Sequence, residues 1–215
     1  MTAPIPIPTP IFRFFHIDNL SIYLDRKGLH ASNFEPDDGL KYKPIHNVDI
    51  QSERHEKTVP CGKNGTLHDY VPFYFGPLSP MLLQLHTGQV DGYDEDQEPL
   101  IYVVSSVQKI QQSDLSYVFT DGHGIARYTS WYDDMKDLDK VDWNVVSARY
   151  WRDTIDDMDR QRRKQSEFLI YSFCPWECVD YIAVCNQTKK LEVDKILNDF
   201  NLSNTKTIVE PLWYY

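Results

Sequence analysis

The chain has 215 residues, of which 41% are hydrophobic and 13% aromatic, and its formal net charge is −10. This length and apolar content fit one folded domain over residues 1–215, and no apolar run approaches the roughly 20 residues that cross a bilayer. The N-terminal MTAPIPIPTP has neither the basic start nor the apolar stretch of a secretory signal, so a cytoplasmic protein without a membrane partner is expected. The net charge weighs against a broadly basic surface for nucleic acid, because Lys and Arg carry phosphate affinity.

The first part of the chain predicts a strand and a helix followed by a long polar segment. The apolar run at residues 11–15 predicts a strand. A helix is expected at about residues 18–26, and Gly28 is suited to end it. Residues 33–65 are polar and carry several Pro and Gly residues, and an irregular stretch of this length in a compact domain usually has a function or is disordered.

A second strand and a second helix follow this segment. Residues 70–75 (YVPFYF) predict a strand, in which Pro72 indicates a sheet edge or a bulge because proline donates no ladder hydrogen bond. Ser79 and Pro80 are typical of an N-cap and a first helical turn, and the helix is expected to run through MLLQLH and stop near Gly88.

The second half of the chain mixes short strands with helical patterns. Residues 130–164 are charged and helical in pattern with aromatic anchors, and residues 193–200 have the spacing of an amphipathic helix. The terminal residues 211–215 (PLWYY) are too aromatic for a loose tail and are expected to dock on the body. Further strands are predicted at residues 100–105, 117–120, 167–173 and 181–185.

The order of these elements indicates the fold class. No regular βαβ alternation connects them, and the GxGxxG fingerprint and the GxxxxGK[ST] phosphate loop are both absent from the sequence. A Rossmann or P-loop enzyme is therefore not expected. The pattern predicts a single α+β domain with a split or mostly antiparallel sheet and flanking helices.

The cysteines do not have the spacing of a metal site. They form no CxxC pair and lack the second close pair or the histidines that zinc requires, so no metal is expected. They are expected to be buried, reduced thiols that pack as small apolar groups. The four are Cys61, Cys174, Cys178 and Cys185.

Charge is distributed unevenly along the chain. Residues 133–142 are acidic, whereas a basic run follows at Arg160, Arg162, Arg163 and Lys164. Taken alone, this run is best interpreted as a solvated helix face. Composition by itself therefore names no function.

Seven segments in series carry a family pattern. They are PTPIFRFFHIDNL (8–20), IQSERHEKTVP (50–60), LHDYVPFYFGPLSPML (67–82), EPLIYVVSS (98–106), YVFTDGHG (117–124), KQSEFLIYSFCPW (164–176) and the terminal WYY. In this order, and across nearly the whole chain, they resemble the DarT family of DNA ADP-ribosyltransferases, the toxins of DarT–DarG toxin–antitoxin pairs. The resemblance implies an ADP-ribosyltransferase-like split, mostly antiparallel sheet.

The same resemblance implies the reaction and its partners. ADP-ribose is expected to pass from NAD, as co-substrate, to a base of single-stranded DNA, and a DarG-like macrodomain antitoxin is the expected protein partner. Thymine N3 is the expected acceptor, because the long matches resemble the thymidine-modifying branch, and guanine is the alternative because a second branch uses it. A protein- or RNA-directed ADP-ribosyltransferase and a non-catalytic nucleic-acid-binding module are rival interpretations, the latter disfavoured by the net acidity.

Two residues are the catalytic candidates by this resemblance. Glu167 stands at the start of EFLIY, where ADP-ribosyltransferases place a glutamate that stabilises positive charge on the ribose and holds a ribose hydroxyl. Its carboxylate, directly or through one relay, is also suited to take the ring N–H proton of the acceptor base. Arg54 lies in IQSERHEKTVP, where a guanidinium can hold phosphate oxygens or polarise a base carbonyl.

The resemblance also assigns a cofactor pocket. Residues 39–57 are expected to form a loop that folds over NAD, and residues 114–167 to form the region that positions the acceptor. Arg13 departs from the family pattern, in which we expect histidine, and Ile22 stands where we expect a small residue. The NAD-binding candidates are Arg13, Phe14, Phe15, Ile22, His30, Arg54 and Tyr74.

The acceptor strand is expected to meet a separate set of residues. His123, in the turn TDGHG, and Met81, at the start of the predicted second helix, are expected to contact an unpaired base. For each of these pocket residues an ordinary structural role is the alternative. The candidates for phosphate contacts are Arg127, Arg149, Arg152, Arg162, Arg163 and Lys164.

Overall fold

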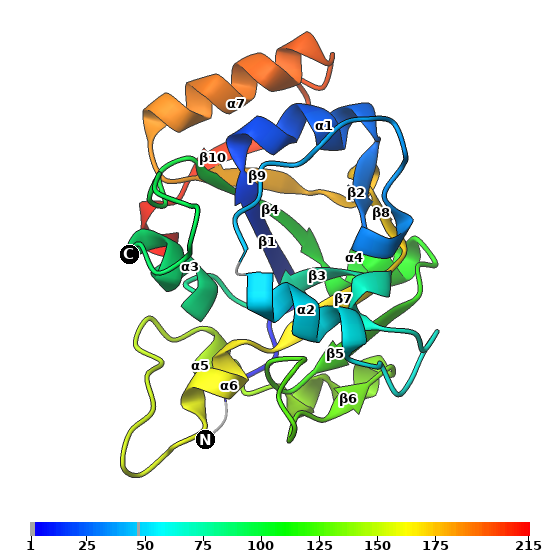
Figure 1. Cartoon of the computed structure of the whole chain (residues 1–215), viewed down its shortest axis with the longest axis vertical. Coiled ribbons are helices and arrows are strands. Elements are labelled where there is room, and N and C mark those ends of the chain that lie inside the picture. Colours follow the sequence, from blue (N-terminus) through cyan, green and yellow to red (C-terminus); the bar gives the residue numbers. More distant parts are fainter. Residues whose placement is uncertain (1–2, 47) are drawn as a thin grey trace.

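A mixed, mostly antiparallel sheet runs through the computed structural model, which describes residues 3–46 and 48–215 (Figure 1). Its strands and those of a small second sheet are β1 (Pro10–His16), β2 (Gly28–His30), β3 (Tyr70–Tyr74), β4 (Leu100–Ser106), β5 (Tyr117–Thr120), β6 (Trp131–Tyr132), β7 (Glu167–Tyr171), β8 (Phe173–Pro175), β9 (Tyr181–Val184) and β10 (Lys206–Val209). The α-helices are α1 (Leu20–Asp25), α2 (Val48–Glu56), α3 (Pro80–His86), α4 (Val107–Gln112), α5 (Trp143–Val146), α6 (Arg160–Lys164) and α7 (Gln187–Asp199).

The main sheet is split near its middle. Its strand order is β10-β9-β4-β1-β3-β7-β5-β6, and among the described residues the pair β9–β10 alone is parallel. β1 pairs along its whole length with β4, but its pairing with β3 is limited to Phe12 opposite Tyr74. The two halves therefore diverge from one shared point, which confirms the predicted α+β fold with a split sheet.

The sheet edge or bulge predicted from Pro72 is wrong, because β3 lies between β1 and β7 and pairs one-to-one with β7 from Tyr70 to Tyr74. Pro72 pairs with Leu169 of β7. On its other side β1 has already diverged, so the missing N–H of the proline costs no ladder hydrogen bond there. The Pro72 carbonyl instead accepts a hydrogen bond from Arg13 Nη1 at 2.9 Å. The split lies between β1 and β3, a position that the sequence did not reveal, and it is what admits proline to a central strand.

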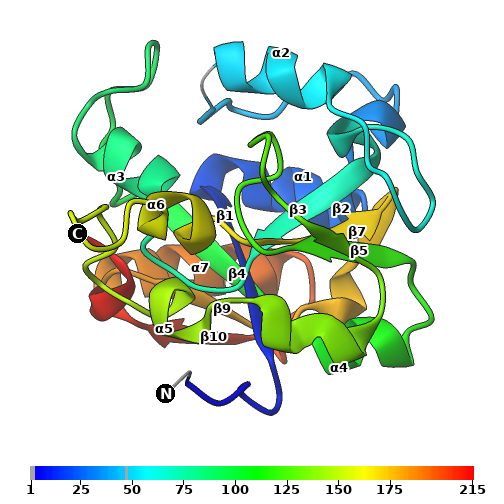
Figure 2. The ribbon, with the colours of Figure 1, turned by 90° about the horizontal axis from the view of Figure 1, so that it is seen from below.

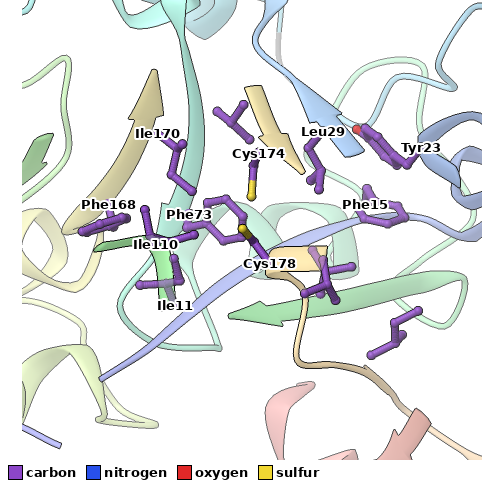
Figure 3. Packing of buried hydrophobic residues seen from close by; sticks show 14 of the residues in the cluster. Ile11, Phe15, Tyr23, Leu29, Phe73, Ile110, Phe168, Ile170, Cys174 and Cys178 are labelled. Atoms are coloured by element: carbon purple, nitrogen blue, oxygen red, sulfur yellow. The ribbon is translucent and has the colours of Figure 1, made fainter. Parts of the chain in front are cut away.

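The apolar residues of these strands form the core shown in Figure 3. Ile11 and Phe73, from the two sides of the split, are both buried in the same cluster. Cys174 and Cys178 are buried there as free thiols, as predicted, whereas Cys61 and Cys185 are partly exposed. Among the described residues, no group of three or more His, Cys, Asp or Glu side chains could hold a metal, and no helix is long and apolar enough to cross a bilayer.

Several predicted elements are confirmed at their ends. Ser79 Oγ caps α3 by accepting from the Leu82 N–H at 3.2 Å, and Gly88 follows the helix with a positive φ of 66°. The late helix α7 buries its apolar face through Val193 and Leu197. The C-terminus docks as expected: the Tyr214 hydroxyl donates to the Leu100 carbonyl at 2.8 Å.

The long helical stretch predicted at residues 130–164 is wrong. The segment holds β6, the 3₁₀ helix η4 (Met135–Lys140), the short helices α5 and α6, and irregular chain between them. Asp134 and Asp142 explain the interruption, because each accepts a backbone N–H and caps a new short helix instead of continuing an old one. Figure 1 shows the irregular segment between α5 and α6 projecting from the body.

Candidate active site

Arg54 and Glu167 form a buried ion pair where strand β7 begins. Arg54 lies near the end of α2, which stands in front of β3 and β7 in Figure 1, and Glu167 is the first residue of β7. Arg54 Nη1 donates to Glu167 Oε1 at 3.1 Å, and Nη2 lies 2.9 Å from Oε2 as an ion-pair contact without hydrogen-bond geometry. The two residues are 8% and 1% exposed. The carboxylate and the guanidinium predicted to be catalytic are therefore in direct contact.

The surroundings of Glu167 keep its carboxyl group ionised. Burial alone raises the pKa of this carboxyl, but the charge of Arg54 and the N–H of Gly124, which donates to Oε1 at 2.8 Å, help to outweigh it, and the pKa lies below its usual value. For Arg54, burial lowers the pKa, and the Glu167 charge more than reverses that effect. Tyr74 faces Glu167 across the β3–β7 ladder, and burial followed by the Glu167 charge raises its pKa. Each charge thus stabilises the other.

A cavity of about 610 Å³ opens beside this pair. Its volume falls within the roughly 300–1,000 Å³ range of small-molecule and cofactor pockets. Although the protein as a whole is acidic, four Lys or Arg side chains line the cavity against two Glu side chains. These charged residues are Arg13, Lys41, Lys43, Arg54, Glu35 and Glu167. The cavity is therefore a locally cationic site, which favours an anionic ligand.

Most of the predicted NAD-binding residues line this cavity. Phe14 also packs edge-on against Tyr102, so the core role and the pocket role that its position allowed are both filled. Ile22 is not among the lining residues; α1 and the turn before it contribute Asn19 and Tyr23 instead. Those predicted residues that do line it are Arg13, Phe14, Phe15, His30, Arg54 and Tyr74.

The predicted covering loop at residues 39–57 is only partly a loop. Residues 40–46 are irregular and line the cavity, but α2 forms the second half of the segment and carries Arg54. The sequence of α2, VDIQSERHE, has no apolar stripe, so the periodicity that identifies surface helices was missing. Before α2, Arg26 holds the segment in place: it donates to both carboxylate oxygens of Asp38 at 2.8 and 2.7 Å and lies over the Tyr42 ring.

The residues predicted to contact DNA divide into three groups. His123 and Met81 line the cavity. Arg127, Arg149 and Arg152 are exposed, the last two on the projecting segment after α5, although Arg149 donates to the carbonyls of Leu212 and Tyr214. The third group, on α6, is engaged inside the protein and consists of Arg162, Arg163 and Lys164.

The α6 residues do not form the solvated helix face that composition favoured. Lys164 is 1% exposed, and its ammonium group donates to the carbonyls of Val146 and Ala148 at 2.6 and 2.9 Å. Arg162 and Arg163 are ion-paired with aspartates from neighbouring segments. The phosphate contact predicted for Lys164 does not fit this burial, because its ammonium already holds two protein carbonyls.

Some residues of the site were not identified from the sequence. Gly124 is the clearest: a Cβ at this position would lie 2.9 Å from Glu167 Oε1, so glycine is required for its N–H to reach the carboxylate. In the sequence, the glycines on either side of His123, Gly122 and Gly124, are the feature that indicates such a close approach. Gln161 on α6 and Gln165 at its C-cap, four residues apart, also line the cavity, and no motif in the sequence marked them.

The fold is that of solved DNA ADP-ribosyltransferase structures. DarT of Thermus sp. 2.9 in complex with ADP-ribosylated ssDNA superposes with a TM-score of 0.93 at 37% identity, and the match covers all of both chains. The same DarT in complex with NAD⁺ matches with a TM-score of 0.88 at 37% identity, over 99% of this chain and 100% of that one. The class of protein is therefore an ADP-ribosyltransferase.

Sequence comparison narrows the class to one family. The profile of "DarT: ssDNA thymidine ADP-ribosyltransferase, DarT" matches residues 12–215, and the chain belongs to this family of DNA ADP-ribosyltransferases. A DNA ADP-ribosyl transferase of Thermus aquaticus is 38% identical over 211 residues, 98% of this chain and 90% of that protein. One from Thermus sp. (strain 2.9) is 38% identical over the whole of both chains, and one from Escherichia coli is 35% identical over 95% of this chain and 93% of that protein.

Proposed function

We propose that this enzyme transfers ADP-ribose from NAD⁺ to N3 of thymine in single-stranded DNA. The observation that carries the proposal is the buried Arg54–Glu167 pair on the wall of a cationic cavity of dinucleotide size. The family description names single-stranded DNA and thymidine. Similar solved structures hold NAD⁺ in one case and ADP-ribosylated ssDNA in another.

The cavity suits NAD⁺ in both size and charge. Its cationic side chains can balance the pyrophosphate, and Arg13 is the best placed of them because its buried Nε has no hydrogen-bond partner among the described residues. Arginine therefore serves where we expected histidine. Tyr74, in the wall beside Glu167, offers a ring for stacking on nicotinamide. Bound NAD⁺ supplies the ADP-ribosyl group, with nicotinamide as the leaving group.

Glu167 carries the largest share of the chemistry in this proposal. Its low pKa keeps it negative at neutral pH, so its carboxylate stabilises the positive charge that develops on the ribose. The same carboxylate accepts the N3 proton of thymine, either directly or through His123, whose pKa burial lowers so that the ring is neutral and free to relay a proton. Arg54 remains charged, fixes the orientation of Glu167 and polarises the base carbonyl next to N3.

The acceptor is tested with oligonucleotides that differ in one base. Purified protein and NAD⁺ are incubated with a single strand that contains one thymine and no guanine. A matched strand has guanine in place of that thymine. The duplex form of each strand is included as well. Mass spectrometry should show an added ADP-ribose on the thymine single strand alone. Modification of the thymine-free strand would refute the thymine assignment and favour guanine. RNA and protein fractions in parallel test the other acceptor classes.

We also propose that a DarG-like macrodomain protein, which removes the mark, restrains this enzyme as its antitoxin. Family membership supports this proposal. Expression of the enzyme in a bacterial host should arrest growth, and co-expression of a macrodomain that hydrolyses ADP-ribosyl thymine should restore it. Growth arrest that an Arg54→Lys, Glu167→Gln double variant still causes would contradict the toxic role of the reaction.

A further inference from the structure

Arg162 connects its own helix, α6, to the loop of residues 121–130. Its guanidinium holds Asp159 on one side, with Nε and Nη2 donating at 2.8 and 2.7 Å. On the other side Nη1 donates to Asp121 at 2.9 Å and to Thr129 Oγ1 at 3.3 Å. The Arg162 carbonyl accepts the His123 N–H at 3.0 Å. Arg162 thus binds the loop of residues 121–130 through both its side chain and its backbone.

This loop returns directly to the catalytic carboxylate. In Figure 2 it rises from the end of β5 toward α2. Gly124 donates its N–H to Glu167 Oε1, and Thr129 Oγ1 closes the loop by donating to the His123 carbonyl at 2.7 Å. Thr120 anchors the near side, since its hydroxyl donates to the Gly122 carbonyl at 2.6 Å. Arg162 anchors the far side.

The two glycines of the turn show how tightly it is held. A Cβ on Gly122 would lie 2.2 Å from Arg162 Nη1, and a Cβ on Gly124 would lie 2.9 Å from Glu167 Oε1. The turn is therefore packed between the guanidinium of Arg162 and the carboxylate of Glu167, with no room for a side chain at either contact. A shift of Arg162 would be transmitted to Gly124 and His123 through a few rigid backbone atoms.

We propose that Arg162 is a positioning residue of the transfer reaction: by holding the 121–124 turn it places the Gly124 N–H and His123 against Glu167. The sequence predicts that Arg162 contacts a DNA phosphate. In the structure its donors are already directed to Asp121, Asp159 and Thr129, so the internal role replaces the phosphate role. The kinetic part of this inference rests on the proposed function, whereas its structural part does not.

The structural part is tested by NMR without any substrate. Among the nine glycines Gly124 alone follows a histidine, so labelling histidine with ¹³C at the carbonyl and glycine with ¹⁵N selects its amide alone. In the wild-type protein this resonance should lie downfield and titrate with Glu167, whose other charged or titratable neighbours are Arg54, His123 and Tyr74. Glu167→Gln should abolish the titration.

Substitution of Arg162 should then move this resonance. Arg162→Met should shift the Gly124 resonance upfield and remove its titration. Arg162→Lys keeps the charge but cannot bond Asp121 and Asp159 with the same geometry, so it should give an intermediate change. Arg163→Lys is the matched control: it stands on the same helix, but its ion-pair partners Asp142, Asp157 and Asp159 all lie outside the loop, and Asp159 keeps both of its contacts with Arg162. A Gly124 resonance that stays the same in Arg162→Met and Arg162→Lys would overturn the proposal.

Kinetics provide the second readout. Losing an aligned hydrogen bond to the charged Glu167 should lower kcat on a thymine strand roughly tenfold or more in Arg162→Met, with KM for NAD⁺ unchanged and the acid limb of the kcat profile moved to higher pH. If Arg162 instead contacted phosphate, the variant would weaken DNA binding and lower its salt dependence while the acid limb stayed in place, and the proposal would fail. A wild-type protein that modifies no DNA refutes the proposed function but leaves the NMR test standing.

Discussion

The Arg54–Glu167 pair makes a quantitative prediction about folding stability. Glu167→Gln removes the negative charge and leaves the Arg54 guanidinium buried without its counter-charge. Breaking a buried pair in this way typically costs about 3–5 kcal/mol. Because the cavity gives water some access to both groups, we expect a loss near the lower limit, about 3 kcal/mol.

This loss is large enough to measure by thermal unfolding. For a chain of roughly 150–250 residues, each kcal/mol lowers the midpoint temperature by about 2–4 °C, so Glu167→Gln should unfold about 6–12 °C below the wild type. Arg54→Met should cost a similar amount, since it leaves Glu167 buried beside Gly124 without the guanidinium. The double variant should cost much less than the sum of the two single losses.

The double-mutant cycle decides between pairing and independent roles. The coupling free energy from the four midpoints, measured at pH 7 without ligand, should be at least about 2 kcal/mol. Gln51→Ala, on the same helix and lining the same cavity, is the matched control and should show no such coupling with Glu167→Gln. Strictly additive losses for Arg54 and Glu167 would refute the ion pair as the organising feature of the site.

Three other predictions follow from single contacts. Because the pKa of Glu167 is lowered in the folded state, the ionised carboxylate stabilises the protein above its ordinary pKa near 4.5, and this stability is lost as pH falls through the folded-state pKa. The difference in free energy of unfolding between wild type and Glu167→Gln, measured in urea, should therefore shrink in acid. A difference that stays constant with pH would contradict this prediction. Lys164→Met, which leaves two carbonyls without a donor, should destabilise the protein by about 2–3 kcal/mol in the same assay, whereas Lys195→Met on α7 should not. Asp38→Asn weakens the hydrogen bonds by which Arg26 holds the cavity-lining segment of residues 40–46. It should raise KM for NAD⁺ several-fold in initial-rate assays while kcat is retained. An unchanged KM would exclude this segment from NAD⁺ binding.

The sequence predicted best where local chemistry alone sets the structure. The N-cap pair Ser79–Pro80 started its helix at the expected residue, and Glu167 opened a strand as the family pattern required. Pro72 misled because its tolerance depends on the split between β1 and β3, a property of three strands that no local window contains. The basic run on α6 misled for a similar reason. Two of its aspartate partners, Asp121 and Asp142, come from distant segments, so the burial of the run could not be inferred from the run itself.

In the proposed reaction, Glu167 and Arg54 together transfer ADP-ribose to thymine. The most direct measurement is tandem mass spectrometry of a one-thymine single strand after incubation with NAD⁺ and wild-type protein, Glu167→Gln or Arg54→Lys, each first shown to be folded. We predict ADP-ribose on the thymine base with the wild type and unmodified strand with both variants. Thymine modified at the wild-type rate by either folded variant would contradict the account.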